Sequence, residues 1–182
     1  IVSIIVTIGL LGINTYGYRE VAFCLDDKKK RSKLFFEITL VRFILMILSF
    51  FAYVPFLFSN FSIYFFIMIF HLVSQFMDFT WLFIGVENLK IVAIRNFLVK
   101  LISTILIFIF VKTPNDLDVY LWILSLSSLI VSCSILFNLK KYIYISIIKE
   151  KIQIKSLIIH SYNSLKLFFP QIGLILFLQV DK

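Results

Sequence analysis

The sequence predicts an all-α protein, a polytopic bundle of transmembrane helices. Composition is the first reason, because 61% of the 182 residues are hydrophobic and only 15% are charged. Soluble domains carry about 45–50% apolar and about 25% charged residues. The second reason is the recurrence of long apolar segments between short polar turns. The third is the alternation of basic and uncharged turns along the chain.

Four segments are predicted as complete membrane spans, since crossing a bilayer takes about 20 helical residues. They are residues 34–58, 63–84, 96–111 and 119–139. Residues 1–13 are apolar but shorter, and residues 167–180 begin another apolar segment. We therefore expect an internal piece of a longer protein, with the end of one helix, four spans and the start of a further helix.

Basic residues are concentrated in three of the five connections. Residues 14–33 and 140–166 each carry six Lys or Arg, and residues 85–95 are also basic. By contrast, residues 59–62 carry none and residues 112–118 carry one. The positive-inside rule therefore places the three basic connections in the cytoplasm. Within the longest of them, the basic run of residues 142–155 is expected to lie along the anionic membrane surface; a role in substrate binding is the alternative.

The motifs of the common catalytic sites are absent from the sequence. It contains no phosphate-binding glycine loop, metalloprotease helix motif, nucleophile elbow or metal-type cysteine spacing. Cys24 lies in a charged loop and Cys133 in an apolar segment, so a structural disulfide is not expected. The net charge of +8 arises mainly from the loops beside the membrane. We therefore expect no enzymatic activity, no cofactor or metal, and no nucleic-acid partner.

One predicted span carries a polar face. His71, Ser74, Gln75 and Asp78 are spaced at i, i+3, i+4 and i+7, which places them on one side of a helix. Asp78 lies about 10 Å from His71 along the axis, still within the hydrocarbon layer. Such groups are costly in lipid unless they face protein or water. Asp78 and His71 are therefore candidates for proton or ion coupling; a structural ion pair for Asp78 and an interhelical hydrogen bond for His71 are the alternatives.

Three basic residues in or near the spans are candidate substrate ligands: Arg42, Arg95 and Lys100. A guanidinium fork suits phosphate geometry, and a cation inside the membrane needs an anionic partner. Each of them is also a candidate partner for Asp78. For Arg42, the alternative is that its side chain extends to the lipid phosphates.

Two further patterns concern packing. Ser125, Ser128 and Ser132 are spaced at i, i+3 and i+7, which predicts a small-residue seam for close helix contact. Trp81 and Trp122 are expected near opposite membrane interfaces, as residues of an aromatic belt.

Three segments carry distinctive motifs. The first has a Tyr-Gly-x-Arg-Glu stretch, an Asp-Asp-Lys run and a Ser-Lys-Leu-Phe helix start; the second has Trp-x-Phe-x-Gly-x-Glu followed by Arg-Asn; the third has Pro-Gln-Ile. Their positions are Tyr16, Gly17, Arg19, Glu20, Asp26, Asp27, Lys28, 32–35, Trp81, Phe83, Gly85, Glu87, Arg95, Asn96, Pro170, Gln171, Asp181 and Lys182. In these motifs and their order the chain resembles the polysaccharide repeat-unit flippases. Ile84 departs from the pattern, since this family often has Gln there.

The resemblance implies the fold of the multidrug/oligosaccharidyl-lipid/polysaccharide exporter superfamily, in which two six-helix lobes surround a central cavity. On that map, residues 1–139 run from the end of helix 2 to helix 6 and form most of the N-terminal lobe. Residues 140–166 become the cytoplasmic link between the lobes, and residues 167–182 the start of helix 7.

The implied activity is the flipping of undecaprenyl-diphosphate-linked oligosaccharides across a bacterial cytoplasmic membrane, for O-antigen or capsule assembly. Arg42, Arg95 and Lys100 would bind the diphosphate, and Asp78 with His71 would couple transport to an ion. Membrane lipids and other membrane proteins of polysaccharide assembly are the expected partners. The alternatives are a drug or cation antiporter of the same superfamily, a membrane glycan polymerase or ligase, and a purely structural subunit.

Overall fold

The computed structural model describes residues 2–10, 12–58, 62–144 and 153–180, and every regular element in these ranges is a helix. Four helical segments are long and apolar enough to cross a membrane. They are Lys28–Phe58, Ser62–Gly85, Leu89–Phe110 and Pro114–Tyr142. The predicted fold class and the four predicted spans are therefore confirmed.

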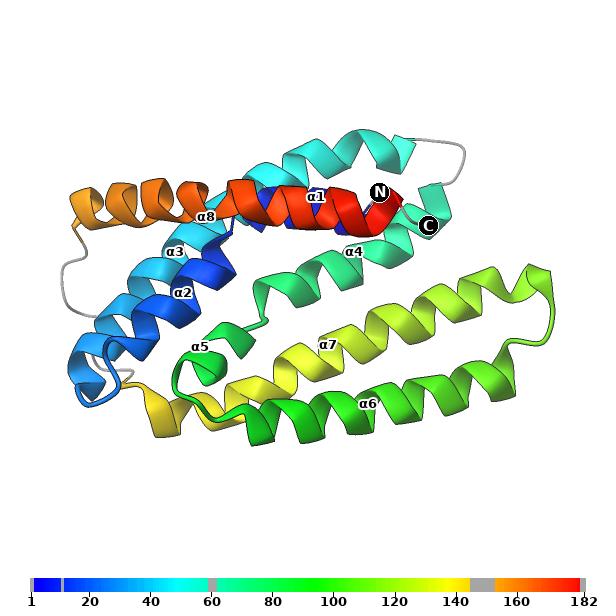
Figure 1. The fold of residues 1–182 in the computed structure, drawn as a ribbon. Helices are drawn as coiled ribbons and strands as arrows, with labels where there is room; N and C mark the ends of the chain where they lie inside the picture. The colour runs from blue at the N-terminus through cyan, green and yellow to red at the C-terminus, as the bar shows by residue number, and fades with distance from the viewer. Residues whose placement is uncertain (1, 11, 59–61, 145–152, 181–182) are drawn as a thin grey trace.

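The helices form a bundle whose turns collect at two ends (Figure 1). The bounds are α1 Val2–Leu10, α2 Ile13–Ala22, α3 Lys28–Tyr53, η1 Val54–Phe58, α4 Ser62–Phe76, α5 Thr80–Gly85, α6 Leu89–Phe110, η2 Pro114–Asp116, α7 Leu117–Tyr142 and α8 Ile154–Val180. The turns that follow α2 and α5 and the C-terminal end of α7 lie at one end of the bundle; the turn between α6 and α7 lies at the other. This arrangement agrees with the predicted alternation of basic and uncharged connections.

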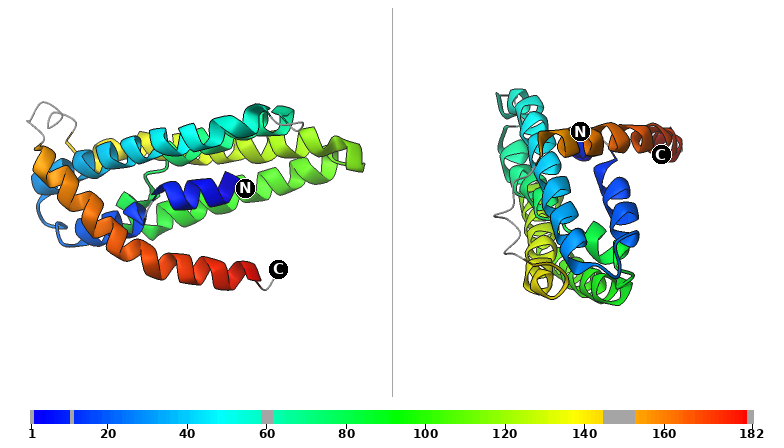
Figure 2. Two further views of the ribbon diagram at one scale, coloured as in Figure 1. Left: turned by 90° about the horizontal axis from the view of Figure 1, so that it is seen from above. Right: turned by 90° about the vertical axis from the view of Figure 1, so that its left-hand side faces the viewer.

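The long helices pack in a chain of neighbours. α7 packs against both α4 and α6, while α3 packs against α1. Helix α8 crosses α2 and α3 and then diverges from the other long helices (Figure 2). It therefore joins the bundle along its first half, at the end that carries the basic connections.

The region predicted as a polar loop, residues 14–33, is largely helical, and that prediction was wrong. Helix α2 occupies Ile13–Ala22 because one of its faces is buried, including Ile13, Tyr16 and Val21. Gly12 separates it from α1 with a φ of 71°, a backbone conformation that favours glycine. The two charged residues of α2 lie away from that buried face, so the helix is amphipathic, a pattern that the average polarity of the segment concealed.

Two of the resembling segments pack directly on each other. A Cβ added at Gly17 would lie 2.6 Å from the ring of Trp81, and one at Gly85 would lie 2.7 Å from Val21. Trp81 is only 2% exposed and stacks on Phe35 with ring centroids 5.5 Å apart. The prediction of Trp81 as an aromatic-belt residue was therefore wrong: the indole fills the contact between α2, α3 and α5.

Helix α8 begins earlier than expected. The sequence predicted a linker up to residue 166, but α8 is helical from Ile154 and Pro170 lies within it. The residues expected to lie along the membrane surface are mostly 145–152, which fall outside the described ranges. The helical part of the predicted linker contacts α2 and α3, and so belongs to the bundle.

Candidate functional site

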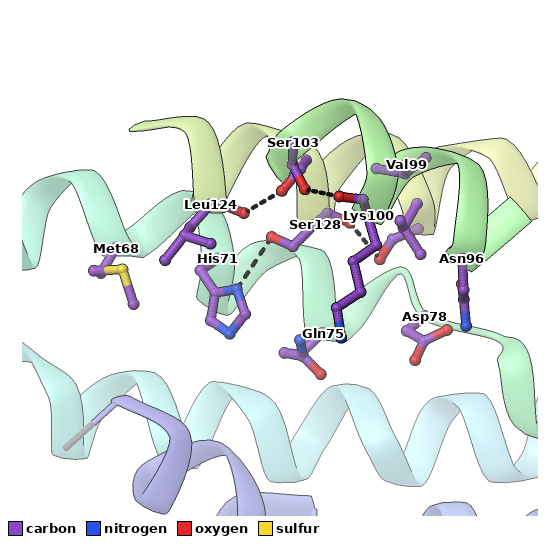
Figure 3. A pocket seen from close by; sticks show the side chains of 13 residues that line it. Met68, His71, Gln75, Asp78, Asn96, Val99, Lys100, Ser103, Leu124 and Ser128 are labelled. Carbon is purple, nitrogen blue, oxygen red and sulfur yellow. Dashed lines mark hydrogen bonds between the residues drawn. The ribbon is translucent and has the colours of Figure 1, made fainter. Parts of the chain in front are cut away.

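A cavity of about 470 Å³ lies between α4, α6 and α7, in the membrane-spanning part of the bundle (Figure 3). Nine of its thirteen lining residues have polar side chains, although the surrounding helices are strongly apolar. The lining residues are Met68, His71, Gln75, Asp78, Asn96, Val99, Lys100, Ser103, Leu124, Ser127, Ser128, Val131 and Ser132. Of the predicted site residues, it brings together His71, Asp78 and Lys100.

The predicted polar face accounts for the α4 side of this cavity. His71, Gln75 and Asp78 line it, whereas Ser74 is fully buried and its Oγ donates to the His71 carbonyl. The His71 Nδ1 lies 3.1 Å from the Ser128 Oγ on α7. His71 therefore makes the interhelical hydrogen bond that the sequence offered as its alternative role, and it does so at the cavity wall.

Asp78 lies where the predicted continuous helix is interrupted. α4 ends at Phe76 and α5 begins at Thr80. The Asp78 carboxylate accepts hydrogen bonds from the backbone N–H of Thr80, at 3.0 Å, and from the Thr80 hydroxyl. Short polar side chains compete with helical bonding in this way and start a new helix. Interrupted membrane helices expose backbone groups that transporters use for binding.

Arg42, on α3, hydrogen-bonds to the backbone at the same interruption. It is 3% exposed and donates from Nη1 to the Asp78 carbonyl at 2.6 Å and from Nη2 to the Gln75 carbonyl at 2.8 Å. These carbonyls lie at the helix end, where intrahelical donors are missing. The guanidinium thus lies behind the cavity wall and positions it; contact between Arg42 and a substrate stays a prediction.

Arg95 is linked to Asp78 through the side chain of Thr80. Its Nη2 donates to the Thr80 hydroxyl at 3.1 Å, and its Nε and Nη2 donate to the Asn96 Oδ1 at 3.1 and 2.9 Å. Arg95 therefore orients Asn96, a lining residue that the sequence marked only as part of a motif. Lys100 is exposed, and its side chain extends along the cavity toward Gln75 (Figure 3).

The serine seam packs α7 against α4, as predicted. Ser125 and Ser132 are buried, and the Ser125 Oγ lies 3.7 Å from the Met68 sulfur. Ser128 and Ser132 also line the cavity, so the seam adds hydroxyl groups to the site.

A second polar cluster was missed by sequence reasoning. Glu37 on α3 is 6% exposed and its Oε2 lies 3.0 Å from the Nε2 of His160 on α8. The Tyr16 hydroxyl lies 2.8 Å from the His160 Nδ1, and Ser156 donates to the Glu37 Oε1 at 2.9 Å. The available signal was the isolation of Glu37 and His160 among apolar neighbours, but their pairing spans more than a hundred residues.

Chemically, the cavity can hold a polar or anionic group. Lys100 supplies a positive charge, Asn96 and Gln75 supply amides, and the serines supply hydroxyls. Among the described residues, no group of three or more His, Cys, Asp or Glu is placed to hold a metal ion.

Comparison with known proteins gives one result. The family model for polysaccharide biosynthesis proteins matches residues 1–182, the whole chain. Neither the curated proteins nor the solved structures gave a match. With four apolar helices of membrane-spanning length, this chain belongs to the polysaccharide biosynthesis protein family and is a multi-pass membrane protein of polysaccharide-related transport.

Proposed function

We propose that this protein moves undecaprenyl-diphosphate-linked oligosaccharide repeat units across the bacterial cytoplasmic membrane, without covalent chemistry. The observation that carries the proposal is a polar cavity with an exposed lysine inside an otherwise apolar bundle. Polar groups at membrane depth are costly, and they commonly mark a substrate or ion path. A diphosphate passing through the membrane requires such a contact.

The size of the cavity favours a headgroup rather than a whole oligosaccharide. Small-ligand pockets are about 300–1,000 Å³, and this cavity is about 470 Å³. The diphosphate with its first sugar would lie near Lys100, while the prenyl chain stays in lipid. Exposed apolar side chains on α6, the helix that carries Lys100, include Phe97 and Leu101. They would contact the prenyl chain in the lipid.

Asp78 is proposed as the coupling residue of this transport. Its carboxylate lines the cavity and takes hydrogen bonds from Thr80, which also accepts one from Arg95. A cation or proton bound at Asp78 would change the charge that faces the substrate.

The test compares two lysines on one helix. Lys100→Ala is expected to lower transport at least tenfold, while Lys90→Ala, an exposed residue at the start of α6, leaves it unchanged. Transport is measured in proteoliposomes with a fluorescent polyprenyl-diphosphate sugar, and in cells as surface polysaccharide normalised to membrane abundance of the full-length protein. Equal transport by both variants would remove Lys100 from the site. Export of a cationic dye with no movement of the lipid-linked sugar would instead indicate the drug or cation antiporter.

A further inference from the structure

The cluster around Glu37 and His160 joins three helices in a buried setting. Tyr16 comes from α2, Glu37 from α3, and Ser156 and His160 from α8, and their hydrogen bonds are 2.8–3.0 Å long. Tyr16 is 4% exposed and His160 is 9% exposed. Buried carboxylates and imidazoles are costly unless they are paired. Here both imidazole nitrogens and both carboxylate oxygens have a partner.

This arrangement can accept a proton while the same pairs of atoms stay hydrogen-bonded. In the neutral state, the Tyr16 hydroxyl donates to Nδ1 of His160 and the imidazole Nε2–H donates to Glu37. In the protonated state, Nδ1–H donates to the Tyr16 oxygen, and Nε2–H still donates to the carboxylate. The phenol keeps its proton in both states, because burial raises the pKa of Tyr16 above its ordinary value.

A second cavity gives the cluster a route to solvent. It measures about 240 Å³, lies between α2 and α8, and has Tyr16 and Asn163 in its wall. Its charged lining residues are Arg19 and Glu20 from α2 and Lys166 from α8. Glu37 is the charged group that α3 directs at the cluster, and the described ranges of α1 and α5 contain no titratable side chain. The cavity lies toward the end of the bundle that carries the basic connections, and so toward the predicted cytoplasmic side.

The cluster lies where α8 meets the rest of the bundle. Next to it, Gly12 packs so closely on α8 that an added Cβ would lie 2.9 Å from the Ser164 carbonyl oxygen. Beyond this contact α8 diverges from the other long helices (Figure 2). A change in the cluster would therefore act at the base of a helix that extends away from the lobe.

We propose that Glu37 and His160 form a proton-binding site, reached from the cytoplasmic side through the cavity at Tyr16, and that its occupancy sets how tightly α8 docks on α2 and α3. The added proton pairs the imidazolium with the Glu37 carboxylate and tightens the contact; its loss weakens the contact. Proton binding here is independent of the transported molecule. Only the link between docking and transport rests on the proposed function.

The test follows the His160 imidazole by ¹⁵N NMR in the purified full-length protein. His71→Gln serves as the control, because it removes the other imidazole of this chain and leaves the cluster intact. Glu37→Gln keeps the size and one acceptor but removes the charge, and is expected to weaken proton binding at His160, because the imidazolium loses its opposite charge. Glu37→Asp, which keeps the charge, is expected to preserve most of the wild-type titration. A second readout is the spin-label distance between α3 and α8, expected to lengthen as the pH rises in wild type and to be insensitive to pH in His160→Gln.

A His160 titration that is the same in wild type and Glu37→Gln would overturn the proton site. A titration that depends on Glu37, with an α3–α8 distance that does not respond to pH, would overturn the docking step. If both readouts respond but the protein does not move a lipid-linked sugar, the proposed function fails and the proton site stands.

Discussion

The two polar clusters of this protein differ in how much of their hydrogen-bonding capacity is used internally. The cavity at the α4 interruption leaves Lys100 exposed and has the amides of Gln75 and Asn96 in its wall, although its four serines donate to carbonyls of their own helices. The cluster at α8 is closed, because the polar atoms of Glu37 and the His160 ring are bonded to each other and to their neighbours. Polar groups without partners inside the protein can bind a molecule that must enter and leave. A cluster whose polar atoms all have partners can take up only a proton.

The two clusters share a structural support. α2 contributes Tyr16 to the closed cluster, and the adjacent Gly17 packs on Trp81 of α5. α5 begins two residues after Asp78, at the edge of the open cavity. The packing of α2 on α5 therefore lies between the two sites.

The largest effect is expected for Arg42→Met, which removes both hydrogen bonds at the α4 interruption. Charge-assisted hydrogen bonds are worth about 1.5–3 kcal/mol each, so the loss of stability is expected to be about 3 kcal/mol or more. Thermal unfolding in detergent measures it, with exposed Arg19→Met as the control for charge loss. Unchanged stability would mean that Arg42 does not hold the interruption, and would favour a direct role in substrate binding.

A somewhat smaller effect is expected for Gly17→Ala, because the new methyl group would overlap Trp81. Overpacking of this kind costs about 1–3 kcal/mol. Combining it with Trp81→Phe is expected to restore part of the stability by making room. If Gly17→Ala also changes the pH response of His160, the α2–α5 contact connects the two clusters; if it changes stability alone, they are independent.

For Asp78, two substitutions separate charge from structure. Asp78→Asn keeps the oxygen that accepts from Thr80, so it is expected to preserve stability and lower transport about tenfold. Asp78→Ala removes the acceptor and is expected to lower both. Transport by Asp78→Asn at the wild-type rate would end the coupling proposal and leave Asp78 as a helix-starting residue.

The smallest effect is expected for Ser156→Ala, because its hydroxyl proton is shared between the Glu37 carboxylate and the Gln153 carbonyl, so the loss is expected to be about 1 kcal/mol. Ser161→Ala is the matched control, since that hydroxyl bonds to a carbonyl of its own helix, that of Leu157. Unfolding midpoints in detergent give both values. A larger loss for Ser161→Ala would show that the cluster adds little to the docking of α8.

Contacts between residues close in the sequence could be predicted at both sites, whereas contacts between residues far apart in the sequence could not. His71 and Gln75 share a wall because of their helical spacing within α4, and Asp78 lines the same wall from the interruption beyond Phe76. Arg42 was predicted as a partner for the charge of Asp78, but its hydrogen-bond partners are backbone carbonyls freed by that interruption, which sequence spacing does not reveal. Glu37 and His160 had no shared pattern at all, because their contact depends on where α8 returns to the bundle.

By itself the sequence determined the all-α membrane bundle and its four spans, because apolar length and loop charge act segment by segment. It also determined the family, which the match over residues 1–182 establishes. Tertiary structure decided which polar groups line a cavity and which are hydrogen-bonded inside the protein, because that depends on the neighbouring helices each group contacts. The same physical rule governs both levels: a polar group inside a membrane protein must find a partner, and the sequence shows the need while the packing of helices supplies the partner.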